Sequence, residues 1–392
     1  MIVAVGLGVA GCLYLLPERF ASNGSVPSAE AITARLRVPD GFSVQLYASG
    51  LEEARMLRFT TAGDLLVSQP RLGVVTLIVR DADGTVRETR PLLRDLNMPH
   101  GIDWYDGWLY VAETDALGRI RFDPATRATT GPFLRIVTGI PSTHHWTRTV
   151  RVGPDHKLYL AVGSSCNVCE ETDRRRAAIV RYELDGSGEH VVASGLRNSV
   201  GLDWQPGTDD LYATDNGRDL LGDDFPPCEL NRIVDGGFYG FPVANGDRTP
   251  DPDFGEGHAD RIARSLPPAF GFRAHNAPLG MTFLRGEDVP AAYRGAALVA
   301  LHGSWNRTHK DGYKVVSLHW AADGSITARD FLTGFLRNED VSGRPVDVAE
   351  GPDGALYVSD DYAGAIYLIT YGAHSVPGDR GSAARSVRPH AQ

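Results

Sequence analysis

One short pattern recurs six times along the chain and constrains the fold more than any other feature of the sequence. Each copy joins a turn containing Gly or Asp to a short apolar strand of the Leu-Tyr-Val type; the copies occupy 62–69, 106–114, 154–163, 207–215, 294–303 and 352–361. Successive copies begin roughly 45–60 residues apart, except for one longer gap between the fourth and the fifth. Self-similarity at such a period is typical of repeat folds and propellers.

Each copy has further strand-like neighbours. An apolar segment precedes every copy, as in MLRFT, GIDWY and TRTVRV, and a third segment follows most copies, as in VVTLIV, GRIRF and AAIVRYEL. A fourth lies between copies, as in VRETRPLL, GPFLRIV, GEHVVA and ARDFLTG, while long helical periodicity is absent. Four strands in each of six units predict an all-β fold, a six-bladed β-propeller over 36–373. The alternative is a pair of large β-sandwiches, which would not need equal repeats.

The longer gap, 216–293, is rich in Gly and Pro and contains the aromatic run 236–242. Segments of this length inside a compact fold are usually functional or disordered, and this one is too aromatic for disorder. We therefore predict an ordered loop excursion over one face of the propeller.

The two ends of the chain differ from its body. Residues 1–16 carry no charge, and they are slightly short for a membrane-spanning helix, which needs about 20 residues. They fit a signal peptide, a lipoprotein signal with Cys12 as the lipidated residue, or an uncleaved membrane anchor. Residues 17–35 are predicted to be a polar linker, and 374–392 a disordered polar tail. All three alternatives place the body in the periplasm or elsewhere outside the cytoplasm, and two of them tether it to a membrane.

The charge distribution argues against one class of partner. The formal net charge is −10, and the Lys and Arg residues are scattered along the chain. Phosphate backbones require a concentrated basic face, so nucleic acid is not expected to be the main partner.

Four cysteines are present, and two of them are close together. Cys166 and Cys169 have the spacing of half a zinc ribbon, but the chain has no second pair, and a closed zinc site needs four ligands. An export context favours a local disulfide between them, and Cys228 would then be free or would compete for pairing.

Propellers bind ligands where loops converge on the central axis, so the polar residues in the loops beside the repeat strands are the candidates for a site. They are rich in Arg, Asn and His: Arg58, His100, His145, Arg148, Arg197, Asn198, Asp215, Asn216, Gly217, Arg218, His275, Asn276, Trp305, Asn306, Arg307 and Arg344. Cations and amides that converge on one point favour an anionic, planar ligand with several carboxylates, because Arg binds carboxylates with two hydrogen bonds and stacks on rings.

At these positions the chain resembles a known family. Several segments resemble, in the same order, segments of the soluble PQQ-dependent sugar dehydrogenases. They are THHWTRT at 143–149 with the following GPDHKLYLAVGSSCNVCEE, GLRNSVGLDW at 195–204, TDNGRDLLGDD at 214–224, APLGM at 277–281, LHGSWNR at 301–307 and GRPVD at 343–347. The branch it resembles most is the sorbosone and aldose-sugar (pyranose) dehydrogenase group. The resemblance covers about 38–372 and implies a six-bladed propeller with pyrroloquinoline quinone (PQQ) flat over the axis and a calcium ion bridging quinone and protein.

The resemblance also implies the catalytic residues. His145 matches the general base that takes a proton from the sugar hydroxyl as a hydride passes to the quinone; His144 is the competing choice. Arg197 and Asn198 match the pair beside the cofactor and its reacting carbonyls. The quinone itself carries the redox chemistry.

The remaining site residues follow in the same way. Gly217 and Arg218 match the pair whose main-chain carbonyls bind calcium, and Arg344 matches an Arg that pairs with a cofactor carboxylate. Trp305 and Arg307 match residues over or beside the ring, and the cofactor shell is completed by Arg58 and Asn276. The acidic residues 215, 219, 223 and 224 are interpreted as a solvated loop, with a second calcium site as the alternative.

One departure from the family pattern, one absent motif and two other functions bear on this hypothesis. The glucose-oxidising relatives carry a Lys near the position of 302–305, and this chain has none there, which fits the pyranose or sorbosone branch. No CxxCH haem motif is present, so electrons must pass to a separate acceptor such as a cytochrome or the quinone pool. One alternative is a calcium-dependent propeller lactonase, which binds its metal with several carboxylate and Asn side chains at the axis, whereas the predicted axial set here is mostly Arg, His and Asn. The other is a noncatalytic binding scaffold, which would not need these polar loops.

Overall fold

The computed structural model describes residues 27–286 and 289–372. The signal or anchor predicted at 1–16 and the tail predicted at 374–392 lie outside the described residues. Among the described residues, no helix is long and apolar enough to span a bilayer.

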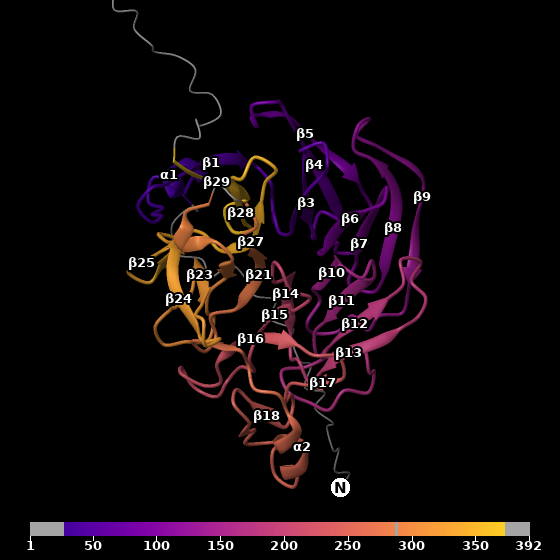
Figure 1. Ribbon diagram of the computed structural model, residues 1–392, viewed down its shortest axis with the longest axis vertical. Coiled ribbons are helices and arrows are strands. Elements are labelled where there is room, and N and C mark those ends of the chain that lie inside the picture. The colour runs from indigo at the N-terminus through magenta and orange to yellow at the C-terminus, as the bar shows by residue number, and fades with distance from the viewer. Residues whose placement is uncertain (1–26, 287–288, 373–392) are drawn as a thin grey trace, which may run out of the picture.

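Six antiparallel sheets account for most of the chain (Figure 1). The first blade contains β2 (Leu57–Phe59), β3 (Leu65–Gln69), β4 (Val74–Arg80) and β5 (Val86–Leu93). The second contains β6 (Ile102–Tyr105), β7 (Trp108–Ala112), β8 (Leu117–Asp123) and β9 (Ala128–Val137). The third contains β10 (Arg148–Val152), β11 (Leu158–Val162), β12 (Ala178–Tyr182), β13 (His190–Ser194) and the short parallel strand β17 (Gly237–Phe238).

The other three blades complete the set. The fourth contains β14 (Ser199–Trp204), β15 (Leu211–Asp215), β16 (Cys228–Ile233) and β20 (Phe270–Phe272). The fifth contains β21 (Pro278–Phe283), β22 (Ala297–Leu301), β23 (Lys314–Trp320) and β24 (Ile326–Leu332). The sixth contains β27 (Pro345–Glu350), β28 (Leu356–Asp360), β29 (Ala365–Tyr371) and, as its outermost strand, β1 (Phe42–Ser49).

The sheets form a closed ring. Neighbouring innermost strands are in contact in the order β2, β6, β10, β14, β21, β27 and back to β2. A separate hydrophobic cluster fills each of the six interfaces between neighbouring blades. The predicted six-bladed propeller is confirmed, and the pair of β-sandwiches is excluded, because a sandwich has one core between two sheets.

Blade six is closed by a strand from the other end of the chain. β1 pairs antiparallel with β29, so the first strand completes the last blade. The helix α1 (Ala29–Thr33) precedes it, and Ile32 of this helix is fully buried in the cluster between blades five and six. The predicted polar linker 17–35 therefore differs from the structure over its described part, which packs on the propeller.

The long gap divides into two parts. Residues 216–227 contact the polar loops described below, as expected of a segment lying on a face. β16 and β20 belong to blade four, and the residues between them form β17, a hairpin of β18 (Ala244–Asn245) and β19 (Thr249–Pro250), and α2 (Ala259–Arg264). Figure 1 shows β18 and α2 outside the ring, beyond blades three and four. This part extends from the rim of the propeller, and the prediction that it covers a face was wrong.

Charged side chains of alternating sign line the middle of the axis. Arg58 lies 3.5 Å from Asp347 and 3.7 Å from Asp103, and Arg151 lies 3.5 Å from Asp103 and 3.4 Å from Asp203. The three aspartates also accept main-chain N–H groups of the next blade, at Leu57, Val152 and Phe283. Arg58 was predicted to complete a cofactor shell, but the structure places it in this ring of ion pairs, where it joins blades one, two and six.

Three short connections complete the elements. These are the 3-10 turn η1 (Ala291–Tyr293) and the strands β25 (Leu336–Arg337) and β26 (Asp340–Val341), which form a hairpin.

Candidate active site

The residues that precede the innermost strands meet at one end of the axis. The Arg55 guanidinium lies over the Trp146 ring at 5.3 Å, and the His100 ring packs edge-on against the same Trp at 5.6 Å. The Asn216 amide donates to the main-chain oxygens of Asn198 and Pro278. These contacts place the starts of β2, β6, β10, β14 and β21 at the same end, which is where the candidate site lies.

His145 is held in one tautomer. Its Nδ1 lies 3.0 Å from the main-chain oxygen of Ser164 and 3.0 Å from the Ser164 hydroxyl, whose own proton goes to the Cys166 carbonyl at 2.7 Å. Both partners can only accept from Nδ1, so Nδ1 carries the proton and Nε2 is a free base. Burial lowers the pKa of His145 well below the usual histidine range, and the charge of Arg197 lowers it further.

The loop that carries His145 is fixed by two buried arginines. Arg148 donates to the main-chain oxygens of His145 and Thr147, each at 2.7 Å, and also to Pro141. Arg176 donates to His145 at 3.3 Å and to Gly163 at 2.7 Å. These cations satisfy the carbonyls of a loop with little regular structure, so Arg148 supports the site through the backbone. The neighbouring His144 is exposed, and its backbone has a positive φ of 58°.

Arg197 is surrounded by acceptors. Its side chain donates to both oxygens of Asn167 at 2.9 Å, to Gly217 O at 2.8 Å, to Asn216 O at 3.1 Å and to the Asp219 carboxylate at 3.0 Å. The backbone N–H of Arg197 and that of Asn198 both donate to the carboxylate of Asp215.

The acidic residues of 215–224 behave in two ways. Asp215 is buried, and burial raises its pKa to about 6. Asp219 also receives Asn306 Nδ2 at 3.3 Å and lies 3.7 Å from His275 Nδ1. Asp223 and Asp224 pair with the loop at 307–308, and the Asp224 side chain is 87% exposed. The solvated-loop interpretation is therefore wrong for Asp215 and Asp219.

Several buried polar atoms at this end have no partner. Asn198 Oδ1, Asn276 Oδ1 and Asn306 Oδ1 accept no hydrogen bond from any residue that the structure describes, and the same holds for His100 Nε2. A Cβ on Gly163 would come within 2.4 Å of Asn198 Oδ1 and 2.7 Å of His145 Cβ, so glycine allows these two side chains to meet. Buried polar groups are rarely left unsatisfied, and such a group calls for a water, an ion or a ligand.

A cationic cluster lies across the axis from His145. Asp361 receives Arg55 Nη1 at 2.5 Å and contacts His302 Nε2 at 2.9 Å. The Arg344 side chain donates to His302 O at 3.2 Å and to Gly303 O at 3.1 Å. Burial lowers the pKa of His302 to about 4, and the charge of Arg344 adds to this effect. With His302 neutral, two arginines face one aspartate, and the cluster carries a net positive charge suited to an anion.

The other residues predicted to bind the cofactor differ in exposure and in their contacts. Trp305 is 55% exposed, on the loop whose next residue reaches Asp219. Arg307 donates to the main-chain oxygens of Asp223 and Ala274, so its guanidinium braces two loops. The main chain of Asn276 accepts from the Gly303 N–H.

The predicted calcium pair has main-chain oxygens, and the aspartates near it are engaged by Arg197 and Arg218. Gly217 O accepts from Arg197, and the Arg218 side chain turns away to Asp251 at 2.6 Å and Asp253 at 2.9 Å. Within the described residues, the only side-chain cluster with metal-ligand geometry is Cys166, Cys169 and Glu171.

The cysteine predictions are confirmed. Cys166 and Cys169 form a disulfide, and Cys228 is free and buried in β16. The disulfide therefore serves as a local staple, and its loop reaches both His145 and Arg197.

Sequence reasoning missed four residues of the site. Arg55 occupies the position expected for Arg58, and aligning the repeats places it level with His100, so the repeat register was the available signal. Asp361 and Asp219 each follow a repeat strand, by one and four residues respectively. In the sequence they look the same as the acidic residues of ordinary surface turns. Asn167 lies between the two cysteines and gave no signal.

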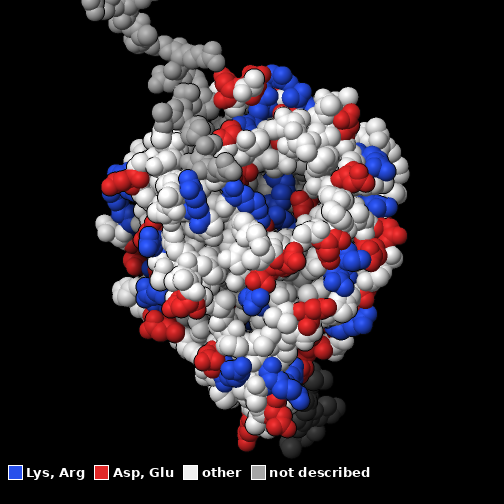
Figure 2. Space-filling model, viewed as in Figure 1, with Lys and Arg blue, Asp and Glu red and all other residues white. Residues whose placement is uncertain are grey.

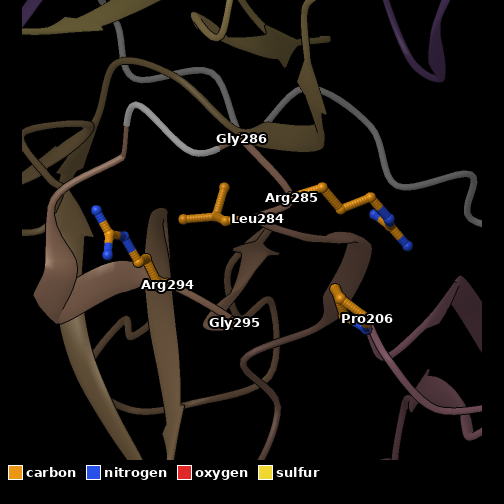
Figure 3. Close-up of a pocket in the computed structure, with 6 residues that line it drawn as sticks. All are labelled: Pro206, Leu284, Arg285, Gly286, Arg294 and Gly295. Atoms are coloured by element: carbon orange, nitrogen blue, oxygen red, sulfur yellow. The ribbon is translucent and has the colours of Figure 1, made fainter.

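One cavity of the described structure lies away from this site. Its volume is about 400 Å³, and its lining follows the far ends of the inner strands: Pro206, Leu284, Arg285, Gly286, Arg294 and Gly295. Figure 3 shows the side chains of Arg285 and Arg294 reaching to opposite sides of it. Arg285 already pairs with Asp203 at 2.8 Å, so no set of polar groups converges there.

The surface charge is mixed. Figure 2 shows Lys and Arg gathered in a hollow near the centre of the face in view, with both signs interspersed over the rest.

Comparisons with known proteins agree on one family. The TrAA12-like family model matches 36–226 and 255–372. An uncharacterised protein of Borreliella burgdorferi is 31% identical over 91% of this chain and 96% of its own length. A pyrroloquinoline quinone-dependent pyranose dehydrogenase of Coprinopsis cinerea is 30% identical over 88% of this chain, which spans 56% of that enzyme's length.

A solved structure gives the same result. The holo form of the pyranose dehydrogenase PQQ domain from Coprinopsis cinerea superposes with a TM-score of 0.74 at 27% identity, covering 86% of this chain and 97% of that domain. The family model matches far more than half of the 392 residues, and the matched ranges contain all the loops of the candidate site. The chain belongs to the TrAA12-like family.

Proposed function

We propose that this protein is a PQQ-dependent dehydrogenase that oxidises a pyranose or a related sugar aldehyde. The relative and the solved domain named above are both pyranose dehydrogenases that use PQQ. The sorbosone and aldose-sugar classes belong to the same proposal, since an aldose hemiacetal and the hydrate of an aldehyde both offer a C–H bond beside a hydroxyl group that a base can deprotonate.

One observation carries the proposal: the tautomer of His145. Its Nδ1–H is committed to Ser164, so Nε2 is the basic atom of the ring. Burial and Arg197 depress its pKa, so the ring is neutral at pH 7 and ready to accept a proton. A buried ring fixed in this way, at the loop end of a propeller axis, is what proton abstraction from a sugar hydroxyl requires.

The residues present fit an anionic quinone. The unsatisfied amide oxygens of Asn198 and Asn276 and the nitrogen of His100 need partners that the described chain does not supply. Arg55 and Arg344 would hold carboxylate groups from the side of Asp361, because guanidinium groups bind carboxylates in pairs of hydrogen bonds. PQQ, when bound, supplies the two-electron redox chemistry.

The chain's own residues supply the rest of the reaction. Nε2 of His145 takes the hydroxyl proton of the sugar, and Ser164 stabilises the resulting imidazolium through Nδ1. Asn198 lies against His145 across Gly163 and offers an acceptor to the substrate or cofactor. Trp305, on the exposed rim, offers an apolar face for a sugar ring.

Calcium is part of the proposal, at the main-chain oxygens of Gly217 and Arg218. Hard oxygen ligands suit this ion, which takes six to eight of them. Gly217 O already accepts from Arg197, and acidic side chains turn elsewhere, so most ligands would come from outside the chain.

Electron transfer and location are proposed from the sequence. Electrons leave to a separate acceptor, a cytochrome or a quinone pool, and the protein works outside the cytoplasm, tethered or free. A propeller lactonase is the second candidate function, but no cluster of axial carboxylates with metal-ligand geometry occurs within 27–286 and 289–372.

The test is reconstitution. Purified protein with PQQ and calcium should reduce an artificial electron acceptor when supplied with an aldose, and omission of PQQ should abolish the reaction. Hydrolysis of a lactone without PQQ, together with no oxidation of any sugar, would contradict the proposal.

A further inference from the structure

The loop between β11 and β12 reaches both residues at the centre of the candidate site. The Cys166–Cys169 disulfide closes a turn with Cα atoms 6.1 Å apart, and Asn167 lies inside it. On one side of the turn, the Cys166 carbonyl receives the Ser164 hydroxyl that contacts His145. On the other side, Asn167 contacts Arg197.

The acceptors around Arg197 fix the direction of its side chain. A guanidinium has five N–H donors, and five acceptors surround this one: two oxygens of Asn167, the main-chain oxygens of 216 and 217, and the carboxylate of Asp219. Arg197 is 4% exposed, so water cannot replace a lost acceptor freely. Asn167 supplies two of the five acceptors: its main-chain oxygen accepts from Nε, and its side-chain Oδ1 accepts from Nη2.

Asn167 also links two blades. Its Oδ1 receives the Asp219 N–H at 2.8 Å as well as Arg197 Nη2, and its Nδ2 donates to Asp219 O at 3.2 Å. The side chain therefore ties the turn of blade three to the loop after β15 of blade four. An amide is needed for this, because a carboxylate has no donor and an aliphatic side chain has neither group.

We propose that Asn167, held in the turn closed by the Cys166–Cys169 disulfide, is a positioning residue that holds Arg197 beside His145. This role of Asn167 deepens the proposed function, and only its effect on kcat and KM rests on that function. Asn167 need not touch substrate or cofactor, since it acts through Arg197.

The electrostatic consequence can be measured on His145. The charged or titratable groups that face this ring are Arg197, His144 and Arg176. Truncation of Asn167 removes Oδ1, the acceptor of Arg197 Nη2, so the guanidinium is held less firmly beside the ring and water can reach the vacated position. Both changes favour the imidazolium, so the pKa of His145 should rise toward its ordinary value.

The experiment compares four variants of the full chain. Asn167→Ala removes the side chain; Asn167→Asp keeps the acceptors and loses the donor; Cys166→Ser with Cys169→Ser opens the turn with Asn167 in place. Val168→Ala, in the same turn, is the matched control. The measurements are the His145 ring titration by NMR without PQQ, the dissociation constant of PQQ, and kcat and KM.

Asn167→Ala should raise the pKa of His145 by about half a unit or more and lower kcat about 10-fold to 100-fold, with a smaller change in KM. The double Cys variant should shift both quantities in the same direction, Asn167→Asp should keep kcat within a few-fold of the parent, and Val168→Ala should change neither. An unchanged pKa and kcat in Asn167→Ala, or equal losses in Val168→Ala, would overturn the proposal.

The titration needs neither PQQ nor sugar. If the parent protein oxidises no sugar, the proposed function fails, and the NMR result still decides the role of Asn167. If Asn167→Ala does not fold, the double Cys variant compared with Val168→Ala gives the same test.

Discussion

His145 and His144 are adjacent in the chain, but their surroundings differ. The rings meet edge-on with centroids 4.4 Å apart. Only His145 has its Nδ1 fixed by Ser164, whereas His144 is exposed. A histidine works as a base when its position and tautomer are fixed, so the contacts favour His145.

Changing His145 to Ala should lower kcat/KM by about 100-fold to 10,000-fold, the usual contribution of a general base. PQQ binding should persist, because the asparagines and arginines that would contact it stay in place. His144→Ala is the matched control and should stay within a few-fold of the parent in the same steady-state assay. Loss of turnover in His144→Ala with turnover retained in His145→Ala would assign the base to His144.

The pH dependence follows from the direction of the His145 shift. The base works when neutral, and burial together with Arg197 moves its pKa downward. The ring therefore stays neutral through pH 6.5–8, about the ordinary histidine pKa and above. Protonation of His145 should therefore not lower kcat/KM between pH 8 and pH 6.5. The acid limb of the pH profile should begin only well below pH 6.5. A half-maximal point at or above pH 6.5 would show that the ring is not desolvated in solution.

At the scale of strands and loops, the repeats could be predicted from the sequence because a buried strand needs a run of apolar residues bounded by turns. That is why β3, β7, β11, β15, β22 and β28 coincide with the six copies. The closing strand β1 was missed because it has no repeat copy beside it, and its pairing with β29 is set by ring closure.

Site residues were readable only where a loop had a recognised motif. His145, Arg197 and Asn198 come from such motifs. Arg58 and Arg55 are three residues apart, and strand register alone decides which of them lines the axis and which faces the site. Asn167 acts through contacts with a different blade, which no local pattern encodes.

The ring of charges along the axis predicts a large effect of one aspartate on stability. Asp203 is 1% exposed, accepts the Phe283 N–H at 2.7 Å and pairs with Arg285 and Arg151. Asp203→Ala leaves two cations and an N–H without this partner, so the free energy of unfolding should fall by about 3–5 kcal/mol. Asp203→Asn keeps one acceptor and should cost about 1–3 kcal/mol.

Unfolding of both variants in guanidinium chloride measures the loss of stability. The control is Asp209→Ala, whose side chain is exposed and whose free energy of unfolding should stay within about 0.5 kcal/mol of the parent. Equal stability of Asp203→Ala and the control would mean that the axis is held by packing alone.

At the scale of the whole molecule, the ring closes where the two ends of the fold meet. Phe42 of β1 packs against Tyr371 of its own blade and against Tyr293 and Phe331 of blade five, with ring centroids 5.1–5.2 Å apart. A closed ring has no free interface, so loosening this junction should weaken all six blades together. Phe42→Ala should lower stability by about 2–4 kcal/mol, and Ser43→Ala, whose side chain is exposed, should change it little.

Calorimetry distinguishes a shared transition from a local one. If the ring is one cooperative unit, Phe42→Ala should unfold in a single transition at a lower temperature, with loss of the site signals of His145 at the same temperature. If β1 packs on the rim without stabilising the ring, a small unfolding transition should appear at lower temperature, separate from an unchanged main transition. The His145 signals should then be lost in the main transition. The second pattern would show that blade six unfolds alone, contrary to the closure seen in the pairing of β1 with β29.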